Sequence, residues 1–179
     1  IAVRSAGVHW PGIGGMSKVA AQRVLRTDQS GFGGKDELVD LIGFDPRTDF
    51  TVQPWLSERL SGPMQPGDVI IGAARELPLG SQLVLFGQPF RVYGKLARTG
   101  SGTQERGVFM QSDSLVTLAP AVRQRAGAAP RMLDPDRVSG FLIEMAPGAT
   151  ELQARFALLS RVPGVKVVAG GSLMTGIRP

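Results

Sequence analysis

The sequence predicts an α+β fold, with a mixed β-sheet built from β-α-β units and a strand-rich second lobe. The first observation is the stretch 67–94, where β-branched runs bounded by glycine predict a strand and then a hairpin. The second is the stretch 150–162, whose capping residues and apolar spacing predict a helix. The third is a weak internal repeat: Pro11-Gly12-Ile13 and Pro163-Gly164-Val165 both stand where a helix would pass to a strand.

The first third of the chain predicts two strands. The chain is strand-like from about Ser17 to Thr27, and Leu38 to Phe44 is the next strand. The stretch 28–34 between them is rich in glycine and predicts a loop. The first helix of the repeat would precede Trp10.

The middle third begins with an irregular, proline-rich stretch, 46–66. The strand 69–71 follows, and then the hairpin Leu83–Val92, for which Gly87-Gln88 is the predicted turn. Either Val84 or Leu85 should point into the core. Residues 107–110 predict a further strand, and Ser112 or Ser114 can cap a helix that runs through Val122.

The last third predicts a strand, a helix and a closing strand. Residues 138–145 are strand-like, and Thr150 with Gln153 forms a capping box at the helix start. The helix places an apolar face outlined by Leu152, Phe156 and Leu159. The closing strand is 165–168, and we expect it in the same sheet as the first strand, with Ile1 and the tail 173–179 on one side of the domain.

Composition restricts the classes of protein. At 179 residues and 42% hydrophobic residues, one domain is expected, without a transmembrane helix or a signal peptide in it. The absence of cysteine excludes disulfides and thiolate chemistry. Residues 1–90 carry 8 basic and 9 acidic side chains (−1), and residues 91–179 carry 12 and 6 (+6), so an anionic neighbour or a solvated surface is expected. Aromatic residues make up only 6%, which argues against nucleic acid as a partner.

Three groups of residues together resemble one family. They are Gly67-Asp68-Val69-Ile70-Ile71-Gly72 with the following hairpin to Gly94, the segment from Ile42 to Leu56, and the segment from Val162 to Val168, which begins Val-Pro-Gly-Val. Their order and spacing resemble the extracytoplasmic domain of MacB/FtsX-type ABC transporter permeases over roughly residues 36–170. Gly80-Ser81 departs from the more usual Gly-Asp of the family, and the first 35 residues match poorly.

The resemblance implies a single extracytoplasmic domain, 1–179, with a β-α-β lobe (about 1–45 and 138–179) and a strand-rich lobe (about 46–137). It also implies a periplasmic location, flanking membrane helices, a cytoplasmic ATP-binding subunit or domain, and a dimeric full-length permease. The domain would be non-catalytic and would couple ATP hydrolysis to substrate export or to a periplasmic partner. An alternative is a regulatory, mechanotransmitting module of a relative that does not transport.

The sequence does not match the motifs expected for catalysis, cofactor binding or metal binding. His9 is the only histidine, and no carboxylate lies within eight residues of it, so no metal ligand set is predicted. Gly33-Gly34-Lys35 lacks the earlier glycine and the following Ser/Thr of a phosphate loop. Asp45 and Asp49, with Asp40 upstream, are the densest acidic set; they fit turns better than the acid–base pair of a small hydrolase. We therefore predict no enzyme, no cofactor and no metal.

The predicted contact site for a partner or substrate is the segment Asp49, Phe50, Trp55 and Leu56. It places two aromatic rings and a leucine in a stretch that Pro54 stiffens, which lowers the entropy cost of binding. The alternative is that these apolar side chains fill the core. We expect Phe50 to be the more buried of the two aromatic residues and Trp55 the more exposed.

Overall fold

The structure is a computed structural model that describes residues 3–4, 14–28, 38–162 and 164–168. The fold is α+β, as predicted, and its main sheet is mixed. In spatial order, this eight-stranded sheet contains β10 (Gly140–Met145), β2 (Met16–Thr27), β3 (Val39–Phe44), β8 (Val108–Gln111), β5 (Asp68–Ile71), β7 (Gln88–Leu96) and β4 (Leu56–Arg59), with β6 (Gln82–Leu85) paired to β7. The pairs β3–β8 and β5–β7 are parallel and the others are antiparallel.

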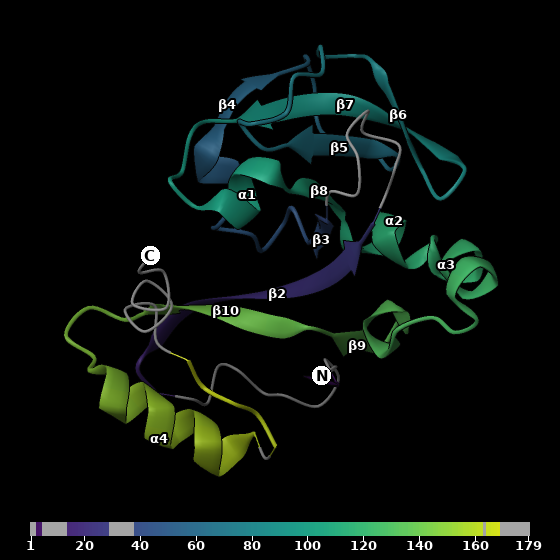
Figure 1. The fold of residues 1–179 in the computed structure, drawn as a ribbon. Helices are drawn as coiled ribbons and strands as arrows, with labels where there is room; N and C mark the ends of the chain where they lie inside the picture. Colours follow the sequence, from purple (N-terminus) through teal and green to yellow (C-terminus); the bar gives the residue numbers. More distant parts are fainter. Residues whose placement is uncertain (1–2, 5–13, 29–37, 163, 169–179) are drawn as a thin grey trace.

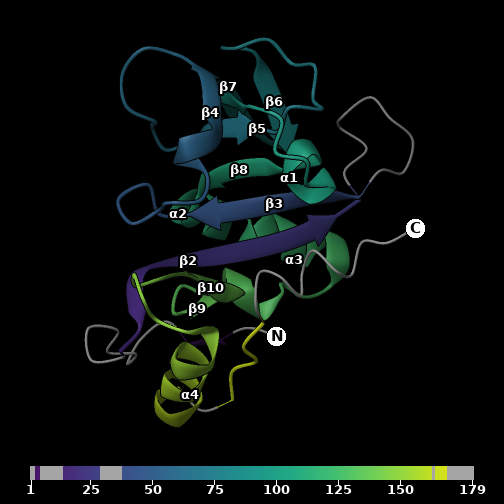
Figure 2. The same cartoon turned by 90° about the vertical axis from the view of Figure 1, so that its left-hand side faces the viewer.

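The elements divide between two ends of the molecule. Strands β4 to β8 and the helix α1 (Gly102–Arg106) lie at one end, and β10 and the longest described helix, α4 (Glu151–Arg161), lie at the other, with β2 and β3 between them (Figures 1 and 2). A two-stranded sheet of β1 (Val3–Arg4) and β9 (Arg137–Val138) lies beside β10. The division into a β-α-β lobe and a strand-rich lobe, with boundaries at about residues 45 and 138, stays a prediction.

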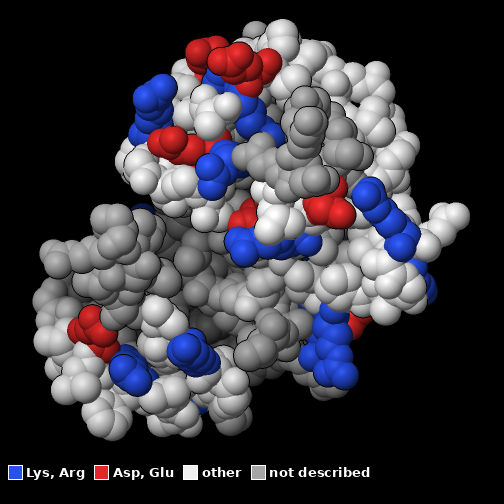
Figure 3. All heavy atoms as spheres, in the orientation of Figure 1, with Lys and Arg blue, Asp and Glu red and all other residues white. Residues whose placement is uncertain are grey.

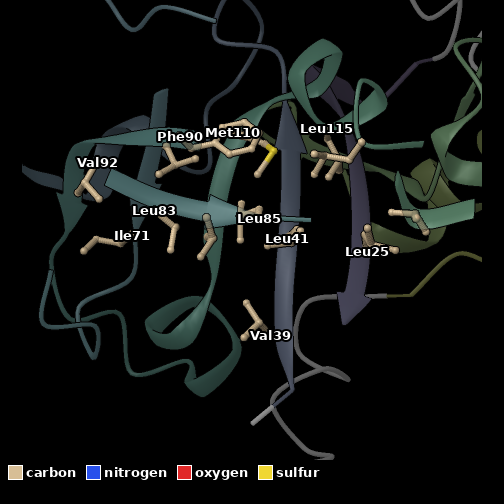
Figure 4. Packing of buried hydrophobic residues seen from close by; sticks show 14 of the residues in the cluster. Leu25, Val39, Leu41, Ile71, Leu83, Leu85, Phe90, Val92, Met110 and Leu115 are labelled. Carbon is tan, nitrogen blue, oxygen red and sulfur yellow. The ribbon is translucent and has the colours of Figure 1, made fainter. Parts of the chain in front are cut away.

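Strand β3 supplies side chains to two hydrophobic clusters. All six of its residues are buried, and consecutive side chains of a strand point to opposite faces of the sheet. Val39 and Leu41 join the larger cluster, which Figure 4 shows together with Leu85 and Met110 from other strands. Ile42 and Phe44 join a second cluster. Apart from Asp40, the residues of this strand are apolar or glycine, as burial on both faces requires.

The hairpin β6–β7 confirms the predicted core position and corrects the predicted turn. Leu85 is fully buried, whereas Val84 is 47% exposed. The turn residues are Phe86 and Gly87, rather than Gly87 and Gln88. Both have positive φ, 50° and 79°, because a two-residue loop needs left-handed residues to match the twist of its strands.

The helix predicted to run through Val122 is two helices. α2 (Ser112–Val116) and α3 (Ala119–Ala126) are separate, and Pro120 lies in the first turn of α3. Proline has no N–H to donate, so it is tolerated at a helix start and breaks a helix interior. Neither predicted serine caps: the N-cap of α2 is Gln111, without a side-chain hydrogen bond.

Two stretches differ from the predicted strand pattern. The irregular stretch 46–66 contains the 3-10 helix η3 (Gln53–Trp55) and the strand β4, which is mostly exposed and so has no apolar alternation. The predicted strand 138–145 is interrupted at Ser139, whose hydroxyl accepts a hydrogen bond from Val24 N at 2.7 Å. A second 3-10 helix, η4 (Arg131–Leu133), precedes β9.

The predicted closing strand is not formed. Residues 165–168 follow α4 without pairing to any described strand, so the prediction that they share a sheet with the first strand is wrong. Val165 and Val167 instead pack against Leu158 and Val162 of the α4 region. Their apolar side chains are thus partly buried by packing on the helix, rather than in a β-sheet.

Helix α4 begins with the predicted capping box. Thr150 Oγ1 accepts from Gln153 N, and the Gln153 side chain accepts from Thr150 N. The side chains that face the sheet are different from those of the predicted apolar face. Ala154 and Leu158 are buried, whereas Leu152, Phe156 and Leu159 are exposed by 63, 68 and 46%. Because α4 carries two apolar stripes, periodicity alone could not select the inward one.

Several predictions lie outside the described residues. They concern the helix before Trp10, the residue His9, the loop 29–34, the phosphate-loop-like Gly33-Gly34-Lys35, and the relative positions of Ile1 and 173–179.

Candidate contact segment and adjacent groove

Asp49 shapes the predicted contact segment from inside. Its carboxylate accepts hydrogen bonds from the main-chain N–H groups of Thr51, Val52 and Gln53, each at 3.0 Å, and from the Thr51 hydroxyl at 2.8 Å. Free amides at a helix start favour such an acceptor. Asp49 therefore fixes the turn that carries η3.

Asp45 and Asp40 do not join Asp49 in one site. Asp45 accepts from the Arg47 guanidinium at 3.0 and 3.1 Å, and this hydrogen bond holds the pKa of Asp45 below its usual range. Asp40 is buried and accepts from Arg26 on β2 at 2.7 and 3.0 Å. The three carboxylates serve three separate local interactions. No group of three or more metal-ligating side chains occurs in the part of the chain that the structure describes.

Leu56 is half-buried and packs on the second hydrophobic cluster. Its Cδ1 atom is close to Gly94 on β7: a Cβ atom built on Gly94 would lie 2.7 Å from it. The glycine therefore makes room for the leucine. Of the two interpretations of Leu56, its position fits core packing better than a free contact.

Trp55 and Phe50 differ in exposure as predicted. Trp55 is 45% exposed, and its main chain is held by hydrogen bonds to Val52 O at 3.1 Å and from Ala97 N at 2.7 Å. Phe50 is half-buried, and the Lys18 ammonium lies 5.7 Å from its ring centroid. The segment thus presents an indole on a backbone that is held by hydrogen bonds. Phe50 lies on the side of the segment that faces α4.

A groove next to Phe50 connects the contact segment with α4. Its volume is about 640 Å³, and it lies between β10 and α4. Its walls include Phe50, Phe141, Ile143, Ala154, Leu158 and Val165. This groove was not predicted from the sequence, because it depends on how α4 packs against β10 and because Phe50 lies far from both elements in the sequence. One feature of the sequence could have indicated it: α4 has a second apolar stripe, through Ala154 and Leu158, which the predicted apolar face did not include.

Charged residues border the groove on the α4 side. Glu151, Arg155 and Lys166 contribute to its lining, and all three are exposed. Figure 3 shows Lys and Arg side chains on the end of the molecule that carries α4. Among the described residues, neither Arg155 nor Lys166 forms an ion pair. Two cations therefore accompany one carboxylate at the edge of an apolar surface.

Comparisons with known proteins give a likeness in fold. No protein-family model matches the sequence, and no curated protein matches it. The structure is similar to the periplasmic region of MacB from Actinobacillus actinomycetemcomitans, with a TM-score of 0.55 and 11% identity over 88% of this chain and 72% of that one. This likeness shows the fold. A second similar structure is the extracellular domain of the noncanonic ABC-type transporter YknZ from Gram-positive bacteria, with a TM-score of 0.49 and 15% identity over 87% and 78% of the two chains.

Residues of the sequence resemblance occupy tightly packed or buried positions of this fold. Gly72, at the end of β5, lies against the α1 turn: a Cβ atom there would come 2.2 Å from the carbonyl oxygens of Gln104 and Glu105. Asp68, at the start of β5, is buried and accepts two hydrogen bonds from Arg91 on β7 at 2.8 and 3.0 Å. Among the described helices, none is long and apolar enough to cross a membrane.

Proposed function

We propose that this chain is a non-catalytic extracytoplasmic domain of an ABC-type permease of the MacB/FtsX kind. The observation that carries the proposal is the fold shared with the periplasmic region of MacB. The framework residues Asp68, Gly72 and Gly94 of the sequence resemblance support it, because they occupy buried or tightly packed positions in that fold. A fold alone does not define a function, so the role of the domain also depends on the contact segment and its residues.

In this role the domain is tethered to the membrane by helices outside the chain. Its full-length permease acts as a dimer with a cytoplasmic ATP-binding subunit or domain. The domain transmits the movement that follows ATP hydrolysis to an exported substrate or a periplasmic partner. The separate use of Asp40, Asp45 and Asp49 in local interactions supports a role in binding rather than catalysis.

The contact surface in this proposal is the segment Asp49–Leu56. Trp55 is its anchor, because an exposed indole on a well-held backbone offers large apolar area at a small entropy cost. Asp49 shapes the turn, and Phe50 links the segment to the groove. Leu56 supports the segment from the core side.

The location is tested by cysteine labelling in the full-length protein. The chain has no native cysteine, so one introduced thiol reports alone from this domain. Val84→Cys places a thiol at a 47% exposed position, and Leu85→Cys is the matched buried control in the same strand. In intact spheroplasts, a membrane-impermeant maleimide should label the first variant and spare the second. Labelling of Val84→Cys only after lysis would contradict an extracytoplasmic location.

A further inference from the structure

The groove between β10 and α4 has the size and lining of a ligand site. Its volume of about 640 Å³ lies within the usual range for small-molecule pockets. One wall is the β10 face with Phe141 and Ile143, and the facing wall is the α4 stripe with Ala154 and Leu158. An apolar chain or ring system placed between these walls would be removed from contact with water on both of its faces.

Charge at the edge of the groove selects one type of head group. Arg155 and Lys166 have no ion-pair partner among the described residues. Glu151 is the one carboxylate among the described lining residues. It lies in the first turn of α4, where the positive end of the helix dipole opposes its charge. Lys18, close to Phe50, is already neutralised by Glu144 at 2.9 Å. The uncompensated charge at the edge is therefore positive.

We propose that this groove binds an amphiphilic anion, a molecule with an elongated apolar body and one anionic head group. The apolar body lies between β10 and α4, and the head group contacts Arg155 and Lys166. This assignment goes beyond the proposed function, because binding needs neither transport nor a partner. The purified chain is therefore sufficient to test it.

The test is a fluorescence titration with 11-(dansylamino)undecanoate, below its critical micelle concentration. We expect saturable binding with one site per chain. Dodecanoate should displace the probe, whereas dodecyltrimethylammonium, with the same chain length and the opposite charge, should compete at least about tenfold more weakly. Equal competition by the two amphiphiles, or no saturable binding, would overturn the proposal.

Variants locate the binding. Arg155→Ala combined with Lys166→Ala should weaken dodecanoate roughly tenfold and leave competition by dodecanol unchanged. Arg161→Ala is the matched control, since Arg161 is exposed on α4 and is not a described lining residue. An equal loss in the control would show that only net charge matters and would overturn the head-group assignment.

A second pair separates the groove from the outer face of α4. Ile143→Ser should weaken dodecanoate and dodecanol alike, roughly tenfold or more, provided that circular dichroism shows a folded chain. Phe156→Ser changes the 68% exposed outer residue and should leave both affinities unchanged. Loss of binding in Phe156→Ser would place the amphiphile on the outer face and overturn the groove assignment. The paired arginine and lysine variant keeps the test decisive if Ile143→Ser fails to fold.

Discussion

The guanidinium of Arg23 on β2 donates a hydrogen bond to the main-chain carbonyl oxygen of Asp134, 2.7 Å away. It also donates to the carbonyl oxygens of Pro135, at 2.9 Å, and Met132. Arg23 is only 5% exposed, and burial lowers its pKa although nearby aspartates oppose this effect. A buried cation therefore holds η4 and the loop after it against β2.

Arg23→Met should lower the free energy of unfolding by about 2–4 kcal/mol. The methionine fills much of the space but donates no hydrogen bond, so three carbonyl groups lose a charged donor. Urea denaturation measures the change. Arg123→Met on the exposed side of α3 is the control and should leave the midpoint unchanged. An unaltered midpoint in Arg23→Met would mean that water replaces the guanidinium without cost.

Two neighbouring residues of β6 should differ strongly in the cost of truncation to alanine. Leu85→Ala should destabilise the domain by about 2–4 kcal/mol, since Leu85 is fully buried and its loss leaves a cavity. Val84→Ala should stay within about 0.5 kcal/mol, because Val84 is 47% exposed. Thermal and urea unfolding give both values. Equal effects would contradict the strand register.

Under the proposed function, Trp55→Ala in the full-length protein should reduce transport or partner binding and leave the stability of the domain within about 0.5 kcal/mol. The half-buried Leu56→Ala should cost more, about 1–3 kcal/mol, because Leu56 packs on the second cluster. Unfolding curves are compared with activity for both variants. A Trp55→Ala domain that unfolds would remove Trp55 from the contact surface.

Asp45 should titrate below the usual range for an aspartate, because Arg47 donates to its charged form. A lowered folded-state pKa adds stability above the unfolded-state pKa, and this stability is lost as the pH falls through the folded-state pKa. Carboxyl-carbon NMR across an acid titration should give a higher pKa for Asp45 in Arg47→Ala. The same midpoint in both proteins would show that Arg47 is not the cause.

Local pattern was sufficient for β2, β3, the β6–β7 strands and the start of α4, whereas β4 was not predicted. The mostly apolar run of β3, the alternation of Leu83, Val84 and Leu85, and the capping box at Thr150 are each decided by a few consecutive residues. Such signals depend on the period at which side chains repeat along a strand and on hydrogen bonds between residues close in sequence. Both can therefore be predicted from a short stretch of sequence. The exposure of Trp55 relative to Phe50 was also predicted correctly.

Only the tertiary structure decided which apolar side chains pack against the sheet and which stay exposed. α4 has two apolar stripes, and the sheet takes the one with Ala154 and Leu158. Val165 and Val167 pack on that helix region instead of forming a strand. The groove follows from the same packing, because α4 faces β10 across it and Phe50, distant in the sequence, is added to its lining. Sequence sets which faces are apolar, whereas long-range packing determines which of them meet.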